Sequence, residues 1–126
     1  LDELLETVQN HLHVVQADLA NPDPDPDDPQ VASDHVETLE TEIDGYDEEL
    51  APLQSFILPG GGPSGARLHH ARTVVRRAER RTVELAQSEP INETVVTYLN
   101  RLSDLLFTLG RVANARDGEP EESPTY

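Results

Sequence analysis

The sequence has no cysteine among its 126 residues, and aromatic residues make up only 4% of it. Without cysteine there is no disulfide framework, no thiolate metal site and no cysteine nucleophile. No apolar run approaches the roughly 20 residues that cross a bilayer, and no basic-then-apolar leader opens the chain. We therefore expect a soluble, cytoplasmic protein whose core is mostly leucine, valine, isoleucine and alanine.

Lysine is also absent, so all nine basic residues are arginine, against 25 aspartate and glutamate residues. The formal net charge is −16. Such an excess keeps a protein soluble but makes it repel itself, and high salt screens that repulsion. The composition therefore suggests a salt-loving source. It also argues against general nucleic-acid binding, which needs a broad basic face.

Four apolar stripes repeat mostly in steps of three and four residues, over 1–19, 36–53, 68–85 and 91–112. This spacing puts each set on one face of a helix. A period of about 3.5 residues favours shallow, left-handed packing between helices. The sequence therefore predicts an all-α fold, a left-handed up-and-down helical bundle in a single domain over residues 1–116.

Proline and glycine mark the connections between the predicted helices. Residues 21–30 (NPDPDPDDPQ) predict an extended acidic linker, because proline recurs every second or third position. Residues 59–65 (PGGGPSG) predict a flexible turn. Ser64 is placed to cap the third helix and Asn92 to cap the fourth. We expect residues 117–126 to form a disordered acidic tail.

Six of the nine arginines fall on the third predicted helix: Arg67, Arg72, Arg76, Arg77, Arg80 and Arg81. Arg72, Arg76 and Arg80 are four residues apart, so they stack on one helix face, where like charges repel. An anionic partner should therefore compensate them. Carboxylates on neighbouring helices are the commoner explanation for such a run, and a polyphosphate is the alternative. The glycine turn before this helix could add N–H groups to an anion site, although it lacks the lysine of a Walker loop.

A second polar stripe lies on the fourth predicted helix and consists of Asn100, Asp104, Phe107, Arg111 and Asn114. Asparagine is unfavourable inside a helix, because its side chain competes with the backbone. Either an ordered polar partner, from a ligand or another subunit, or a solvated face would explain this stripe.

Metal motifs are weak in this sequence. Neither histidine pair, at 11 and 13 or at 69 and 70, shares a helix face, and no Glu-x-x-His occurs. Residues 23–28 imitate the start of a calcium loop but place Asp28 where that loop needs glycine. We predict no metal-binding residues.

Three long runs resemble one family. Residues 56–81 (FILPGGGPSGARLHHARTVVRRAERR) are similar to the signature of the PduO-type ATP:cob(I)alamin adenosyltransferases. Residues 98–111 (YLNRLSDLLFTLGR) resemble their second block, and residues 4–20 (LLETVQNHLHVVQADLA) resemble a helix of that family. The likeness covers nearly the whole chain, and together with the acidic composition it points to a haloarchaeal member.

The resemblance implies a five-helix bundle that assembles as a homotrimer with active sites between subunits. It implies transfer of the adenosyl group of ATP to cob(I)alamin, with release of triphosphate and assistance from Mg²⁺. The reduced cobalt is the nucleophile at the ribose 5′-carbon, so the protein must position the reactants and stabilise leaving-group charge. ATP and a corrinoid are then the substrates, and a cobalamin reductase is a further candidate partner.

The same resemblance assigns roles to individual residues. The positions that match the family's ATP-contacting residues are Arg76, Arg77, Glu79, Arg80 and Asn100. Glu79 would orient an arginine or a metal-bound water. Arg72 matches an arginine that pairs with an acidic residue on a preceding helix, and Phe56 matches the aromatic that fills the lower axial face of the corrin. The resemblance thus names Phe56, Arg72 and Arg76 as catalytic.

The chain departs from the family pattern at its start. The family begins with a glycine- and threonine-rich nucleotide loop and a helix carrying Asp-Glu-Leu, and neither is present here. We expect that this upstream part was trimmed, so that four of five helices remain. The alternative hypothesis is a non-catalytic helical bundle that binds ATP or a partner as a regulator or scaffold. A third, an acidic coiled-coil interaction protein, predicts that carboxylates neutralise the arginines.

Overall fold

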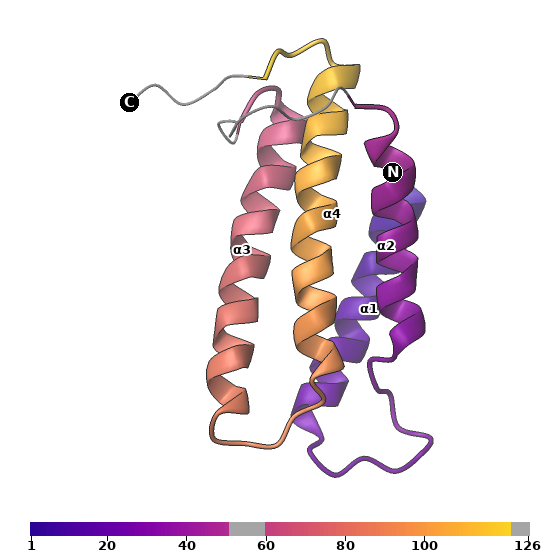
Figure 1. Ribbon diagram of the computed structural model, residues 1–126, viewed down its shortest axis with the longest axis vertical. Coiled ribbons are helices and arrows are strands. Elements are labelled where there is room, and N and C mark those ends of the chain that lie inside the picture. Colours follow the sequence, from indigo (N-terminus) through magenta and orange to yellow (C-terminus); the bar gives the residue numbers. More distant parts are fainter. Residues whose placement is uncertain (51–59, 122–126) are drawn as a thin grey trace.

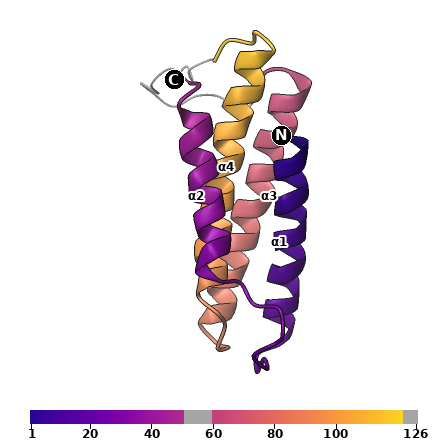
Figure 2. The ribbon, with the colours of Figure 1, turned by 90° about the vertical axis from the view of Figure 1, so that its right-hand side faces the viewer.

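The computed structural model describes residues 1–50 and 60–121, which form four long helices side by side (Figure 1). These are α1 (Asp2–Ala20), α2 (Ser33–Asp47), α3 (Pro63–Ala86) and α4 (Thr94–Arg116). Successive helices run in opposite directions (Figures 1 and 2), and the described ranges contain no strand. The predicted all-α, up-and-down bundle is therefore confirmed. No helix in these ranges is both long and apolar enough to cross a membrane.

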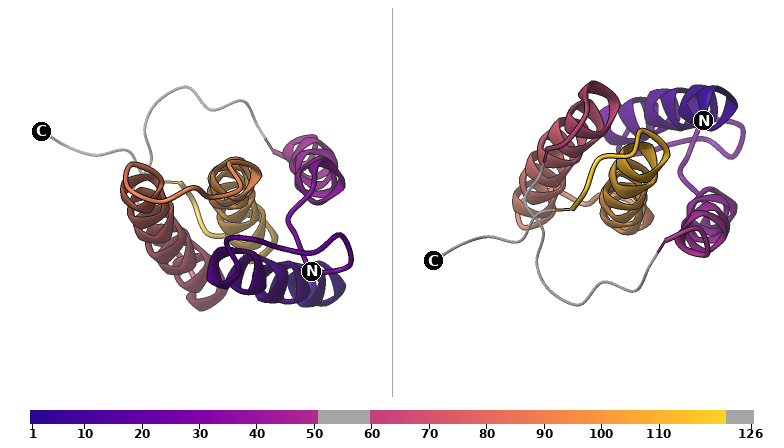
Figure 3. Two further views of the ribbon diagram at one scale, coloured as in Figure 1. Left: turned by 90° about the horizontal axis from the view of Figure 1, so that it is seen from below. Right: turned by 90° about the horizontal axis from the view of Figure 1, so that it is seen from above.

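Helix α4 is the most buried element of the bundle. Seen end-on, it is flanked by α3 and α2, while α1 packs along a third side (Figure 3). Its largest fully buried side chains are Tyr98, Leu102, Leu105 and Leu109. The helix meets apolar residues of α1 and α2 in one core, among them Val8, Val15, Val36 and Leu39. These are positions of the apolar stripes, so the predicted core faces are confirmed for these three helices.

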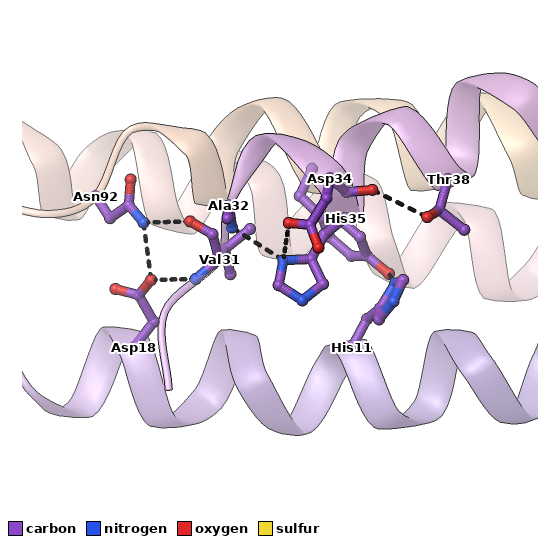
Figure 4. A network of polar contacts seen from close by, with 9 residues as sticks. His11, Asp18, Val31, Ala32, Asp34, His35, Thr38 and Asn92 are labelled. Carbon is purple, nitrogen blue, oxygen red and sulfur yellow. Dashed lines mark hydrogen bonds and ion pairs between the residues drawn. The ribbon is translucent and has the colours of Figure 1, made fainter. Parts of the chain in front are cut away.

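Three segments are tied together at the lower end of the bundle (Figure 4). Asp18, near the end of α1, is only 7% exposed, and its Oδ2 accepts hydrogen bonds from Val31 N at 2.8 Å and Asn92 Nδ2 at 2.9 Å. Asn92 Nδ2 also donates to the Val31 carbonyl at 2.8 Å. A buried carboxylate requires such partners. The cluster therefore fixes the end of the non-helical 21–30 linker against the loop before α4.

Replacing Asn92 with alanine should lower the free energy of unfolding by about 2 kcal/mol, because the buried Asp18 and the Val31 carbonyl each lose a partner. Asn92 Oδ1 also accepts from Thr94 N at 3.1 Å in the first turn of α4, and this bond is lost too. Urea unfolding at constant salt measures the effect. Asn10→Ala, on the exposed face of α1, is the matched control. Equal stability of the two variants would show that the cluster contributes nothing.

The N-cap residues of α3 and α4 both differ from those predicted. Asn92 Oδ1 accepts from Thr94 N, but the N-cap of α4 is Glu93, so the predicted N-cap at Asn92 lies one residue too early. The predicted cap by Ser64 is wrong, because the N-cap of α3 is Gly62, two residues earlier, and the helix begins at Pro63. Proline has its φ preset for the first helical turn and no N–H that needs a partner there. Ser64 therefore lies inside the helix with an exposed side chain.

The first residues after α4 make specific contacts with it. Glu119 N donates to the Asn114 carbonyl at 2.8 Å, and Glu121 Oε1 lies 2.6 Å from Arg111 Nε. Arg111 is only 6% exposed, so this ion pair satisfies a buried guanidinium. Residues 117–121 of the predicted acidic tail are thus placed beside α4, whereas 122–126 lie outside the described residues.

Candidate active site

The two polar stripes of the sequence meet along the seam between α3 and α4. The helices run antiparallel, so each step down α3 matches a step up α4 (Figure 1). The residue pairs that approach across this seam are Gly65 and Asn114, His69 and Gly110, Arg72 and Phe107, and Glu79 and Asn100. Arg72 and Glu79 of α3 therefore lie on the same seam as the polar stripe of α4.

The arginines of α3 are left without carboxylate partners. Within residues 1–50 and 60–121, none of the six forms an ion pair. Each of the three arginines on α4 does: Arg101 pairs with Glu40, Arg111 with Glu121 and Arg116 with Glu49. The described part of the chain thus provides no internal neutralisation of the α3 run, although carboxylates outnumber arginines overall. Uncompensated positive charge at this density favours an anionic ligand.

Two candidate ATP-binding residues are in direct contact. Asn100 Nδ2 donates to Glu79 Oε2 at 3.3 Å, and Asn100 Oδ1 accepts from Arg101 Nη1 at 2.6 Å. Arg101 in turn donates from Nε to Glu40 Oε1 at 3.1 Å, which extends the chain of contacts from α3 across α4 to α2. The polar partner that Asn100 was predicted to need is therefore present within the same chain.

Arg72 lies against an aromatic ring and not against a carboxylate. Its Cζ is 5.2 Å from the centroid of the Phe107 ring, a cation–π distance. The His69 ring packs near the same phenylalanine, with centroids 5.9 Å apart. A Cβ at Gly110 would lie 2.7 Å from the His69 ring, so the glycine makes room for the imidazole. Phe107 thereby links the guanidinium of Arg72 to a buried histidine.

His69 is 4% exposed, and its Nε2 has no hydrogen-bond partner in the described part of the chain. Burial lowers the pKa of His69, as does the neighbouring Arg72 guanidinium, while Glu121 partly offsets this. On α1, burial likewise lowers the pKa of His11, whose Nδ1 shares a hydrogen bond of 2.9 Å with the Tyr98 hydroxyl. Both imidazoles are therefore held neutral near pH 7.

The free energy of unfolding should fall as the pH is lowered from about 7.5 to about 5.5. A histidine whose pKa is lower in the folded state binds its proton more readily when unfolded, so acid favours unfolding below the ordinary value of 6.5. Urea titrations across this range measure the slope. The double variant His11→Gln and His69→Leu should have a flatter profile, and an unchanged slope in that variant would assign the pH dependence to other groups.

Asn114 holds the glycine turn that precedes α3. Its Oδ1 accepts from Gly62 N at 3.0 Å and its Nδ2 donates to the Gly60 carbonyl at 2.7 Å. Gly61 has a φ of +100°, which favours glycine. The second asparagine of the α4 stripe thus also has its partner within the chain, and neither a ligand nor another subunit is needed to satisfy it.

Sequence comparison now decides the family. A family model described as cobalamin adenosyltransferase matches residues 1–113, which is most of the chain. The chain belongs to this family. The resemblance carried by residues 4–20, 56–81 and 98–111 is therefore confirmed, and the matched range includes the seam between α3 and α4 except for its end at Asn114.

Members of this family agree with the chain in sequence and in fold. It is 50% identical over 116 residues to a corrinoid adenosyltransferase of Bacillus subtilis, covering 92% of this chain and 59% of that protein. It superposes with a TM-score of 0.91 and 36% identity on a phenylalanine variant of a PduO-type ATP:corrinoid adenosyltransferase from Lactobacillus reuteri complexed with cobalamin and ATP, covering 98% of this chain and 70% of that one. An arginine variant of the Lactobacillus reuteri enzyme complexed with ATP gives a TM-score of 0.89 at 35% identity, with the same coverage. The chain spans about three fifths of the length of the Bacillus subtilis relative.

Most candidate residues of this chain lie on one helix. Arg72, Arg76, Arg77, Glu79 and Arg80 lie on α3, and Asn100 on α4 contacts Glu79. Phe56 lies outside the described residues. The sequence interpretation missed His69 as a member of this seam, because the pair with His70 was weighed only as a metal motif. No group of three potential metal-ligating side chains occurs in the described residues.

Proposed function

We propose that this chain is part of an ATP:cob(I)alamin adenosyltransferase, which transfers the 5′-deoxyadenosyl group of ATP to cob(I)alamin. The products are adenosylcobalamin and inorganic triphosphate. The observation that carries the proposal is the arginine run of α3, which forms no ion pair within residues 1–50 and 60–121, beside the Glu79–Asn100 contact in a chain of this family. The named relatives are corrinoid adenosyltransferases, and two solved ones hold ATP.

The proposed chemistry needs charge stabilisation more than a catalytic base. An electron pair of cob(I)alamin forms the bond from cobalt to the ribose 5′-carbon, and the bond from that carbon to the triphosphate oxygen breaks. The triphosphate leaves with the electron pair of the broken carbon–oxygen bond and develops negative charge. Arg76, Arg77 and Arg80 supply guanidinium groups that bind phosphate oxygens bidentately, and the anion in turn relieves the repulsion along the run.

Glu79 suits a Mg²⁺ ion bound chiefly by ATP. Mg²⁺ usually keeps several waters and takes one or two carboxylates together with the substrate's phosphates, so a dedicated cluster of three ligands is not required. Glu79 is half-buried, and only its Oε2 is engaged by Asn100. Glu79 would hold the ion or its water through Oε1, and the ion would neutralise phosphate charge alongside the arginines.

Phe56 and Arg72 complete the proposed catalytic set. The phenylalanine and arginine changed in the Lactobacillus reuteri variants are separated by the same number of positions as Phe56 and Arg76. The equal separation supports matching Phe56 and Arg76 to the phenylalanine and the arginine that were changed in those enzymes. An apolar ring at Phe56 would exclude a lower axial ligand from cobalt. Arg72 would pair with an acidic residue upstream of α1, and its cation–π contact with Phe107 holds it at the seam.

We also propose the assembly and setting that the family resemblance implies. The enzyme would be a homotrimer with sites at subunit interfaces, in the cytoplasm of a halophilic organism, and a cobalamin reductase would supply cob(I)alamin. The exposed side chains of Arg76, Arg77 and Arg80 support this arrangement, because a neighbouring subunit could cover ATP bound there. The lysine-free acidic composition supports the high-salt setting.

A spectroscopic adenosylation assay at high salt tests the proposed function. Chemically reduced cobalamin and Mg-ATP are mixed with this chain and, in parallel, with a version that carries its native upstream sequence. We expect adenosylcobalamin from the longer form. If neither form produces it while both remain folded, the chain is a non-catalytic regulator or scaffold of the same ancestry.

A further inference from the structure

The amide of Asn100 is held in one orientation by opposite partners at its two ends. Its Nδ2 donates to Glu79 Oε2 on α3 at 3.3 Å, and its Oδ1 accepts from Arg101 Nη1 at 2.6 Å. An amide turned end for end would set its oxygen against the carboxylate and its NH₂ group against the guanidinium. The bond from Arg101 is the shorter of the two, so Arg101 contributes most to this orientation.

Arg101 is itself anchored by α2. Its Nε donates to Glu40 Oε1 at 3.1 Å, and Asp104 Oδ2 lies 4.0 Å from its Nη1. The guanidinium thus reaches Asn100 with one nitrogen while a second nitrogen is fixed to another helix. The planar fork of arginine allows this bridge, whereas lysine has only one charged nitrogen. The chain of contacts from α2 through α4 to α3 therefore depends on this one guanidinium.

The guanidinium of Arg101 belongs to the α2 side of α4. It lines a hollow between these two helices whose other lining residues are Glu40, Ile43, Asp44 and Asp104. Among the described residues, none on α3 lines this hollow. Two carboxylates lie beside Arg101, whereas the arginines of α3 form no ion pair within residues 1–50 and 60–121. We therefore place Arg101 behind Asn100 and not among the groups that would bind phosphate.

The orientation of the amide decides what Asn100 can offer a ligand. Its Nδ2 carries two hydrogens, and one of them is directed to Glu79. The other has no acceptor in the described part of the chain. Phosphate oxygens are acceptors, so an amide that presents its nitrogen binds them and one that presents its oxygen repels them. With Arg101 on its oxygen, Asn100 is set as a donor beside the carboxylate proposed to hold Mg²⁺.

We propose that Arg101 is a positioning residue for ATP: from its anchor on Glu40 it holds Oδ1 of Asn100 and turns the amide nitrogen toward Glu79 and the triphosphate. The inference rests on the proposed function, because it takes Asn100 and Glu79 as residues of the ATP site. The role is exerted through Asn100, which makes it separable by experiment from direct binding of phosphate.

Steady-state kinetics of the Arg101→Met variant, with the native upstream sequence present, test this role. Methionine keeps an apolar stem and removes the guanidinium. We expect the KM for ATP to rise about tenfold, because the amide is then free to turn its oxygen toward the phosphates. The KM for cob(I)alamin should stay within about twofold, since the change acts on the ATP side. Arg101→Gln should give the same selective rise, because it has one amide nitrogen in place of a bridge of two.

The matched control is Arg116→Met. Arg116 also lies on α4 and binds a carboxylate at the end of α2, with Nη2 2.8 Å from Glu49 Oε2, but it does not contact Asn100. Its side chain is 50% exposed, against 38% for Arg101, so both variants lose a partly exposed ion pair. Arg116→Met should leave both KM values within about twofold of the wild type.

A double-mutant cycle shows whether Arg101 acts through Asn100. An Asn100→Ala enzyme has no amide to orient, so adding Arg101→Met should raise its KM for ATP by no more than about twofold. That result would support the proposal. If the two substitutions instead multiply their separate effects, Arg101 acts independently of Asn100 and the proposal is overturned.

The remaining outcomes also decide the matter. Equal rises in both KM values, with a lower melting temperature, would mark general destabilisation and overturn the proposal. An unchanged KM for ATP in Arg101→Met would overturn it while leaving the adenosyltransferase function standing. Only an inactive wild type would remove both, and that result comes from the wild-type assay before any variant is made.

Discussion

Replacing Arg76 with alanine should lower the rate of adenosyl transfer about a hundredfold or more, a loss of about 2.7 kcal/mol in transition-state stabilisation. Arg76 is exposed, at the middle of the three stacked arginines, and has no ion pair in the described part of the chain. Its charge-assisted bonds to phosphate would be made only when ATP is present, and they would strengthen as the triphosphate leaves. Binding and rate should therefore both suffer.

The same substitution should leave the fold intact or slightly stabilised. Like charges four residues apart cost a few tenths of a kcal/mol in a helix, and Arg76→Ala removes that repulsion toward Arg72 and Arg80. Arg67→Ala is the matched control, because Arg67 is also exposed on α3 but matches no ATP-contacting position. Arg76→Lys should recover only part of the activity, since lysine cannot bind phosphate bidentately. Normal turnover by Arg76→Ala would refute the phosphate assignment.

Periodicity predicted the helices and much of the core. Apolar spacing is a local property of the sequence, and the positions that it selected on α2 and α4 include the fully buried Leu39 and Leu105. The same arithmetic placed Arg72, Arg76 and Arg80 on one face of α3. Where a helix starts depends on which of several neighbouring residues fits its first turn best. The φ of Pro63 is preset for that turn, so α3 begins at Pro63 and Ser64 is not its cap.

The partners of the polar residues could not be predicted in the same way. Asn100 and Asn114 were recognisable as unfavourable inside a helix, yet Glu79 and the glycine turn reach them only because α3 and α4 pack in one antiparallel register. That register is set by the whole bundle and leaves no local signature. The same register also determines which arginines are neutralised by carboxylates. Carboxylates are abundant in the sequence, but the packing directs Glu40 and Glu49 to α4 arginines and not to the α3 run.

Replacing Phe56 with alanine should impair adenosylation far more than ATP binding. The assigned role of its ring is to keep any ligand from the lower axial position of cobalt, which makes the metal easier to reduce to its nucleophilic state. Without that ring, water or a corrinoid base could coordinate cobalt, and we expect the rate to fall about a hundredfold. The ATP affinity should hold, because the arginines that would bind the phosphates lie on α3, beyond the glycine turn.

The measurement that isolates this role is the spectrum of enzyme-bound cob(II)alamin in the presence of ATP, which distinguishes four-coordinate from five-coordinate cobalt. The wild type should show the four-coordinate form, and Phe56→Ala should show the five-coordinate one. Phe56→Trp, which keeps an apolar ring, should restore part of the four-coordinate signal and part of the rate. Equal losses of ATP affinity and adenosylation in Phe56→Ala, with no change in coordination, would count against the axial role. They would instead indicate that Phe56 supports the site as a whole, as a scaffold residue does.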